Sequence, residues 1–213
     1  MPPPAPTAEA QRARLLTATI FTTLMGAPLT IARGLWGLWL LSWLAAAGWS
    51  AKTVARQSLP ARLAHITLLC AGALLLFKRP YPMSWLQGPL LAIPPGATWV
   101  AVGVLLAGFA FAWWARLHLG RNWSGTVTLK ADHALVRSGP YGITRNPIYT
   151  GLLLSLVATV LLRNDVAAVI GFALILTGLL IKIRQEERLL AGHFGPAYAA
   201  YRADVPALVP RLW

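Results

Sequence analysis

The sequence predicts an all-α protein: a polytopic membrane helical bundle of five or six transmembrane helices with a cytoplasmic C-terminal helical cap. Two observations support this class. Of the 213 residues, 57% are hydrophobic and only 12% are charged, whereas roughly 25% of a typical soluble domain is charged. The apolar residues also gather in runs long enough to cross a bilayer, and basic residues flank these runs.

Six apolar segments are candidate membrane spans. The first contains an internal Gly26-Ala27-Pro28, so a helix lying in the membrane interface is its alternative. The second is rich in tryptophan, which is typical of the aromatic belt at a membrane surface. In order, the predicted spans are Ala13–Ile31, Leu35–Ala51, Leu63–Phe77, Ala97–Ala115, Asn146–Leu162 and Val166–Ile183.

Two connections shape this bundle. Tyr81–Gly96 is rich in proline and glycine and cannot form one continuous helix. Arg163-Asn164-Asp165 separates the last two spans by a tight break, which predicts a helical hairpin. Before the hairpin, the alternating segment Thr126–Lys130 indicates a short strand or an extended segment.

The net charge of +13 would suggest nucleic acid in a soluble protein. Here the basic residues form no continuous stripe, so we expect contacts with anionic lipid headgroups and no nucleic-acid partner. With both termini cytoplasmic, only Arg33, Lys78, Arg79 and Arg163 fall outside. This asymmetry predicts a multi-pass protein whose C-terminus and candidate site face the cytoplasm.

The segment Gly139-Pro-Tyr-Gly-Ile-Thr-Arg-Asn-Pro-Ile-Tyr-Thr-Gly151 has a composition that a lipid-facing helix does not need. Asn146 as N-cap and Pro147 at the first helical position predict the start of a helix. The same helix start is a favourable place for an anionic group. Arg145 either extends to lipid phosphates or binds a ligand, and Gly151 serves close helix packing or the approach of a flat ligand.

Glu186 and Glu187 stand out because the chain has only six acidic residues. Adjacent residues on a helix point about 100° apart, so one glutamate can pair with Arg184 or Arg188 on the surface. The other would face the bundle, where its partner is Arg145 or a ligand ammonium. Further along, Tyr198 and Tyr201 share one helix face, which docks on the membrane or lines a site.

Histidines occur singly at His65, His118, His133 and His193, without the spacing of metal ligands, so we expect no metal site. His118, at the end of a span, is the histidine expected nearest to a site. Turn backbone, one arginine, one or two glutamates and tyrosines suit a polar, zwitterionic cofactor that carries its own reactivity.

Several motifs occur in a recognisable order from Arg116 to the C-terminus. They are Leu135-Val-x-x-Gly-Pro-Tyr141, Arg145-Asn-Pro-x-Tyr-x-Gly151, Glu186-Glu-x-x-Leu190, Phe194-Gly-x-x-Tyr-x-x-Tyr201 and Pro206 with Pro210. This order resembles the isoprenylcysteine carboxyl methyltransferase family, to which phospholipid N-methyltransferases are related. Asn146 departs from the pattern, because the family usually has histidine there. Asparagine forms hydrogen bonds but does not take up a proton near pH 7.

The resemblance implies S-adenosylmethionine as cofactor and a lipophilic acceptor that arrives from the bilayer. It implies nine cofactor-binding residues: Gly139, Pro140, Tyr141, Arg145, Pro147, Tyr149, Gly151, Glu186 and Glu187. We expect His118, Val136, Asn146 and Tyr198 to line the same site. The proline-rich residues 1–12 predict a disordered tail, and the resemblance divides the rest into variable helices on the substrate side (13–115) and a cofactor-binding core (116–213) with the helical hairpin 146–183 and the C-terminal cap.

Several activities remain open at this point. A prenylcysteine-type carboxylate would be held by Arg145 or Arg202, whereas an amine acceptor would need Glu187 as a base, and a thiol would need its thiolate stabilised. A membrane reductase using NADPH is a second possibility, and a non-catalytic membrane protein with a relic pocket is a third. The identity of the acceptor and the oligomeric state are not predicted.

Overall fold

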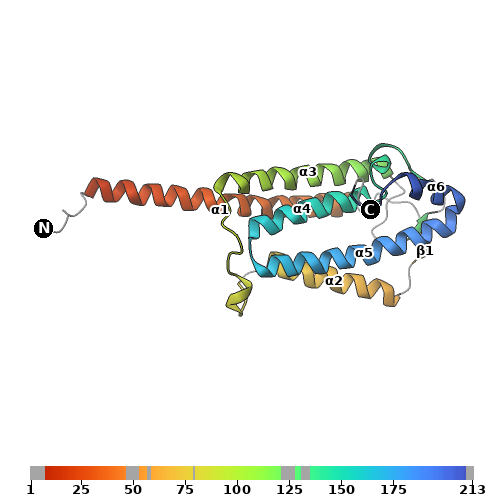
Figure 1. Ribbon diagram of the computed structural model, residues 1–213, viewed down its shortest axis with the longest axis horizontal. Helices are drawn as coiled ribbons and strands as arrows, with labels where there is room; N and C mark the ends of the chain where they lie inside the picture. The colour runs from red at the N-terminus through yellow and green to blue at the C-terminus, as the bar shows by residue number, and fades with distance from the viewer. Residues whose placement is uncertain are drawn as a thin grey trace.

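The computed structural model describes residues 8–46, 53–56, 59–78, 80–120, 128–130 and 135–209. The described part is mainly helical, and its long helices lie side by side in an elongated bundle (Figure 1). Its α-helices are α1 (Ala8–Ala45), α2 (Leu59–Phe77), α3 (Pro95–Leu119), α4 (Pro147–Arg163), α5 (Val166–Phe194) and α6 (Pro196–Asp204). Short 3-10 helices occupy η2 (Ser84–Leu86) and η4 (Gly139–Gly142).

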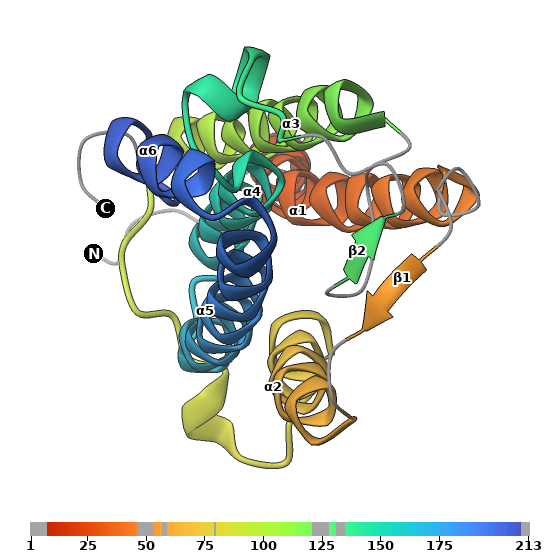
Figure 2. The ribbon, with the colours of Figure 1, turned by 90° about the vertical axis from the view of Figure 1, so that its right-hand side faces the viewer.

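The helical class is therefore confirmed, with one small addition. Strands β1 (Thr53–Arg56) and β2 (Thr128–Lys130) form a two-stranded antiparallel sheet in which Arg56 pairs with Thr128. Figure 2 shows this ribbon beside the ends of α1 and α2. The alternating segment predicted β2, but nothing in the sequence indicated its partner.

The largest difference from the prediction concerns α1. The sequence predicted separate spans at Ala13–Ile31 and Leu35–Ala51, whereas the structure has one helix of 38 residues that continues through Pro28. Nothing turns the chain between the two apolar runs, because Ala32 and Trp36 pack on α3 and keep this stretch helical. The helix also includes residues 8–12, which were assigned to the disordered tail, and Trp49 lies outside the described residues.

The other predicted spans match helices of the structure. The proline-rich connection ends where α3 begins, and α4 starts at Pro147 with Asn146 as its N-cap residue. Helix α5 runs beyond the predicted end at Ile183 and includes the acidic pair, ending before Gly195, which has a positive φ of 51°. The C-terminal cap is α6, which lies at the same end of the bundle as the start of α4 (Figures 1 and 2).

Glycines allow two pairs of helices to pack closely. A Cβ on Gly108 of α3 would lie 2.5 Å from the carbonyl oxygen of Gly151 on α4, and the reverse contact has the same length. Gly72 of α2 and Gly171 of α5 face each other in the same way, at 2.6 and 2.7 Å. These contacts are shorter than side chains tolerate, so each crossing requires glycine on both helices.

The predicted tight break between α4 and α5 is confirmed. Asn164 ends α4 in the left-handed conformation, with φ of 49°, and Asp165 caps α5 by accepting a hydrogen bond of 2.8 Å from the amide of Ala168. Arg163 donates to the same carboxylate at 2.9 Å, and both side chains are buried, with exposures of 1% and 0%. A paired, buried carboxylate therefore fixes this end of the hairpin.

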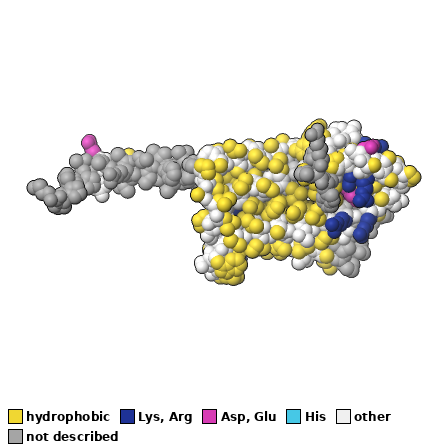
Figure 3. All heavy atoms as spheres, viewed as in Figure 1, with side chains coloured by type: hydrophobic (Ala, Val, Ile, Leu, Met, Phe, Trp, Pro, Cys, Tyr) yellow, Lys and Arg dark blue, Asp and Glu magenta, His cyan; other side chains and the backbone are white. Residues whose placement is uncertain are grey.

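Two helices in the described part, Gly96–Leu119 and Val166–Phe194, are long and apolar enough to cross a membrane. The apolar helices Leu63–Phe77 and Pro147–Arg163 are shorter. Hydrophobic side chains cover the face shown in Figure 3, and Lys and Arg gather at the end that carries α6. Large apolar side chains such as Leu41, Leu74 and Val100 are exposed, as expected for helices in contact with lipid.

The glycine crossing of α3 and α4 gives a matched test. Gly108→Ala should lower the melting temperature, because its Cβ would overlap the α4 backbone and overpacking costs about 1–3 kcal/mol. Gly103→Ala makes the same change on the same helix, where no atom lies within 4 Å of the new Cβ. Thermal unfolding in detergent should separate the two variants, and equal melting temperatures would contradict the close crossing.

Candidate functional site

Polar side chains meet where α4 begins and α5 approaches its end. We call Arg145, Asn146, Tyr149, Glu186 and Glu187 the polar cluster. The first three come from the turn into α4 and its first helical residues, and the two glutamates come from α5. All five were predicted as site residues, and the hairpin brings them together because its two helices run antiparallel.

An ion pair between Arg145 and Glu187 lies at the centre of the polar cluster. The Arg145 Nε donates to Glu187 Oε1 at 3.0 Å, and Nη2 donates to Oε2 at 3.4 Å. The side chains are only 7% and 15% exposed. The remaining Nη1 donates to the carbonyl oxygens of Arg202 and Val205. Arg145 therefore binds protein groups instead of extending to lipid phosphates.

Glu186 makes a second set of contacts on the next face of α5. Its carboxylate accepts hydrogen bonds from the Tyr149 hydroxyl at 3.0 and 2.9 Å. Lys182, one helical turn earlier, lies 3.7 Å from the same carboxylate, and its ammonium lies 5.4 Å from the centre of the Tyr149 ring. Pairing of one glutamate with Arg184 or Arg188 on the surface was therefore the wrong alternative.

Asn146 has the predicted N-cap position, but its side chain does not cap α4. Its Nδ2 donates instead to Glu187 Oε1 and to the carbonyl oxygen of Ala207, both at 3.1 Å. The amide thus links the ion pair to the C-terminal segment. The Glu187 carboxylate lies beside this helix start, and an anionic ligand group there stays a prediction.

The segment Val205–Leu208, which we call the C-terminal strap, covers the turn into α4. The backbone amide of Arg145 donates to the carbonyl oxygen of Pro206 at 2.8 Å, and that of Asn146 donates to the carbonyl oxygen of Ala207 at 3.1 Å. The Thr150 hydroxyl donates to the carbonyl oxygen of Leu208 at 2.8 Å. The sequence indicated an extended tail here, but no pattern showed that its carbonyl groups would bind this turn.

The Gly139–Gly142 turn lies beside the end of α3. Gly139 has a positive φ of 59°, and a Cβ there would lie 2.8 Å from the His118 ring. His118 Nε2 also lies 2.9 Å from the Ser138 hydroxyl. His118, the histidine expected nearest to a site, thus lies against this turn, and glycine is needed both for the backbone conformation and for the close contact with the histidine.

Two buried tyrosines tie this turn to α6. Tyr201 donates a hydrogen bond of 2.6 Å to the carbonyl oxygen of Tyr141. Burial raises the pKa of Tyr201 to about 12. Burial first, and then the neighbouring Tyr201 and Glu186, raise the pKa of Tyr141 well above its usual range. Both phenols therefore remain neutral at physiological pH, and Tyr201 remains a hydrogen-bond donor.

Other predicted residues lie around the polar cluster, and the Tyr198 side chain interacts with Arg145 there. Gly151 faces α3, as its packing interpretation predicted. Pro140, Pro147 and Tyr198 are buried, and Val136 is half-buried. The Arg202 side chain is exposed, and only its carbonyl oxygen reaches Arg145, so the catalytic role assigned to Arg202 stays a prediction.

Two residues of this region were missed by the sequence reasoning. Lys182 contacts Glu186, and its position four residues earlier on the same helix was an available signal. Thr150 gave no such signal, because its hydroxyl binds a carbonyl group that is distant in sequence. In the part of the chain that the structure describes, no group of three or more His, Cys, Asp or Glu residues could hold a metal ion.

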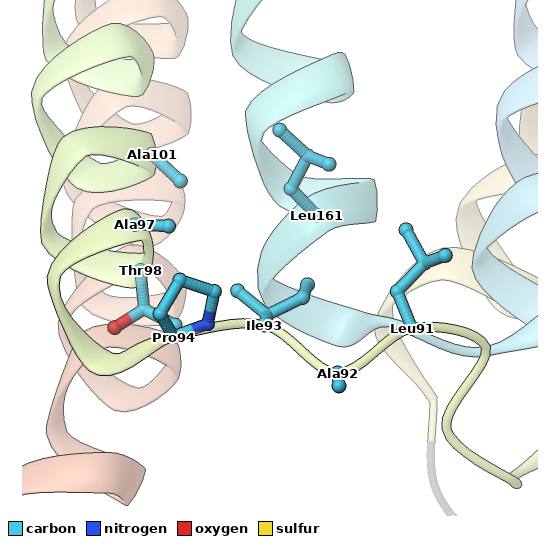
Figure 4. Close-up of a pocket in the computed structure, with 8 residues that line it drawn as sticks. All are labelled: Leu91, Ala92, Ile93, Pro94, Ala97, Thr98, Ala101 and Leu161. Carbon is cyan, nitrogen blue, oxygen red and sulfur yellow. The ribbon is translucent and has the colours of Figure 1, made fainter.

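An apolar cavity of about 350 Å³ lies at the other end of α3 and α4 (Figure 4). Leu161, which helps to line it, is fourteen residues after Pro147, which corresponds to about 21 Å along a helix. The cavity is therefore separate from the polar cluster. Its lining residues are Leu91, Ala92, Ile93, Pro94, Ala97, Thr98, Ala101 and Leu161.

The largely buried ion pair of Arg145 and Glu187 predicts strong coupling between α4 and α5. Glu187→Ala should destabilise the protein by about 3 kcal/mol or more, because it leaves the Arg145 charge buried without its carboxylate. Arg145→Met combined with Glu187→Ala should cost less than the sum of the single changes. A double-mutant cycle of unfolding free energies measures this difference.

The exposed pair of Arg137 and Asp204, at 3.1 Å, is the matched control. Its coupling should stay below about 1 kcal/mol, as for other solvent-exposed pairs. Equal coupling energies for the two pairs would show that Arg145 and Glu187 are no more tightly linked than a surface pair.

Comparison with known proteins finds one matching family model and several relatives of similar sequence. Residues 100–192 match the model of the isoprenylcysteine carboxyl methyltransferase (ICMT) family. A protein-S-isoprenylcysteine O-methyltransferase of Schizosaccharomyces pombe is 32% identical over 115 residues, which cover 53% of this chain and 49% of the relative. The cobalt-zinc-cadmium resistance protein CzcN of Cupriavidus metallidurans is 34% identical over 54% of this chain and 53% of its own length.

Among solved structures, the eukaryotic intramembrane Ras methyltransferase ICMT is similar, with 21% identity and a TM-score of 0.47. That alignment covers 75% of this chain and 55% of the solved one. The chain thus spans about half the length of the curated relatives it matches. The matched region, residues 100–192, includes the polar cluster, α4 and most of α3 and α5, and over this region the chain is similar to the isoprenylcysteine carboxyl methyltransferase family.

Proposed function

We propose that this protein is an integral membrane methyltransferase that transfers a methyl group from S-adenosylmethionine to a lipophilic acceptor. The observation that carries the proposal is the ion pair of Arg145 and Glu187, held by Asn146 inside the region that matches the family. A prenylcysteine-type carboxylate is the acceptor class we favour, because the S. pombe relative is a protein-S-isoprenylcysteine O-methyltransferase.

The chemistry of the polar cluster fits this cofactor. S-adenosylmethionine carries a sulfonium and an ammonium, and the adjacent carboxylates of Glu186 and Glu187 are partly exposed groups of opposite charge. Because Gly139 has no side chain, the His118 ring packs directly against this turn, and His118 and the turn would line the cofactor site together. Tyr141, Tyr149 and Tyr198 would complete the walls.

The membrane arrangement follows from charge and length. We propose that α1 to α5 cross the bilayer, with the polar cluster, α6 and the C-terminus on the cytoplasmic side. The gathering of Lys and Arg at the α6 end supports this orientation. Helix α1, with 38 residues, exceeds the roughly 20 residues that a span requires. The acceptor would then enter from the lipid phase toward the same end.

The reaction needs no covalent protein nucleophile, because the cofactor supplies the electrophilic methyl group. The task of the chain is alignment of the acceptor and exclusion of water. The guanidinium of Arg145 already binds Glu187 and two carbonyl oxygens. We therefore assign the exposed Arg202 to an acceptor carboxylate, whereas Glu187 would take the proton from an amine acceptor.

Two other activities remain as alternatives. One is methylation of a phospholipid amine or a thiol, and a thiol acceptor is supported by the 42% identity over 74 residues to methanethiol S-methyltransferase 2 of Bradyrhizobium diazoefficiens. The other is an NADPH-dependent membrane reductase. A non-catalytic role is the least favoured, because the polar cluster keeps Arg145, Glu186 and Glu187 in direct contact with hydrogen-bonding partners.

Ligand binding tests the cofactor directly. S-adenosylhomocysteine should stabilise the detergent-solubilised protein by about 2.7 kcal/mol at a hundredfold excess over its dissociation constant, and NADPH should not. Thermal unfolding with each ligand measures the difference. Stabilisation by NADPH alone would favour the reductase, and stabilisation by neither would overturn the methyltransferase.

The same measurement locates the site. Glu187→Gln and Tyr149→Phe should each weaken S-adenosylhomocysteine binding. The first removes a negative charge from the polar cluster and the second removes a hydroxyl group, both with little change in side-chain volume. Arg184→Ala, on an exposed face of α5, is the control and should bind like the unaltered protein. Normal binding by both cluster variants would place the cofactor elsewhere.

A further inference from the structure

We infer that Asn146 is a positioning residue that fixes the Glu187 carboxylate and the C-terminal strap relative to each other without taking part in proton transfer. The inference rests on the proposed function, because it concerns the affinity of the same site for its cofactor. Its basis is one amide nitrogen that donates to two acceptors from different parts of the chain.

The geometry defines the orientation of this amide. The two groups 3.1 Å from Nδ2 are a carboxylate oxygen and a backbone carbonyl oxygen, and both only accept hydrogen bonds. The reversed amide would place an acceptor against two acceptors. Nδ2 must therefore face both groups, and both of its N–H bonds are used.

Asn146 restricts Glu187 in a way that Arg145 alone does not. Glu187 Oε1 accepts from Arg145 Nε at 3.0 Å and from Asn146 Nδ2 at 3.1 Å, so one carboxylate oxygen has two donors. Two donors at one oxygen limit rotation of the carboxylate. The orientation of Glu187 is then set before a ligand binds, which reduces the cost of ordering the site.

Asn146 also holds the strap at a buried point. The carbonyl oxygen of Ala207 accepts both the backbone amide and the side-chain amide of Asn146, each at 3.1 Å. Ala207 and Leu208 are buried. A change at Asn146 therefore acts on Glu187 and on the strap together, whereas Thr150 contacts the strap without contacting Glu187.

Few other side chains supply this pair of donors. A neutral histidine carries one N–H, aspartate carries none, and glutamine is longer by one methylene. The charged or titratable groups that face this point are Arg145 from the same turn, Glu187 from α5, and Tyr198 and Tyr201 from α6. Asparagine does not titrate, so its two hydrogen bonds are kept at every physiological pH.

Three variants test the inference through the dissociation constant of S-adenosylhomocysteine. Asn146→Leu removes both donors and should weaken binding by about tenfold or more, since hydrogen bonds to charged groups are among the strong ones. Thr150→Val is the matched control, because it removes a hydroxyl that contacts the strap, the Asn146 carbonyl oxygen and Thr144 but not Glu187, and its effect should be clearly smaller. Melting temperatures without ligand establish that each variant is folded.

The third variant, Asn146→His, gives a pH readout that a purely structural role would not produce. A protonated imidazole offers two N–H donors, and one is lost as the pH rises through about 6.5. Affinity of this variant should therefore fall between about pH 6 and pH 8, whereas the unaltered protein should show little change over the same range.

The outcomes are distinguishable. Failure of the unaltered protein to bind S-adenosylhomocysteine would overturn the proposed function, and this inference with it. If the unaltered protein binds, normal affinity of Asn146→Leu, an equal loss in Thr150→Val, or a pH-independent Asn146→His would each overturn the role of Asn146 alone. The proposed function would stand in those cases.

Discussion

The ion pair between Arg145 and Glu187 is the interaction on which the arrangement of the polar cluster depends. It joins the turn before α4 to the far part of α5. At the other end of the hairpin, the buried pair of Arg163 and Asp165 joins the same two helices. A buried charge is tolerated only with its partner, so each pair restricts how α4 and α5 slide or rotate against each other.

Glycine contacts between helices and the hydrogen bonds of the C-terminal strap lie in different parts of this fold. The contacts of Gly108 with Gly151 and of Gly72 with Gly171 bring helix backbones together within the apolar part of the bundle. Hydrogen bonds are concentrated at the end where α6 and the C-terminal strap cover the turn before α4. The apolar cavity lies at the opposite end of α3 and α4 (Figure 4), so it is separated from the polar cluster.

Much of the helical fold could be predicted from local signals. Proline at the first position of α4, the Asp165 cap of α5 and the glycine after α5 each mark a helix end through local chemistry. The continuity of α1 through Arg33 and Gly34 could not be predicted in this way, because packing of Ala32 and Trp36 on α3 maintains it. The strand β1 likewise depends on β2, which is distant in sequence.

The sequence by itself determined the helical class, the hairpin, and the turn and acidic-pair residues that meet in the polar cluster, because these follow from composition and short-range spacing. Tertiary structure decided which glutamate binds Arg145 and where the Asn146 amide points. Neighbouring residues on α5 face about 100° apart, so the rotation of that helix against α4 selects Glu187 for Arg145 and Glu186 for Tyr149. The docking of Ala207 on Asn146 depends on a chain segment sixty-one residues away, and no local pattern could specify it.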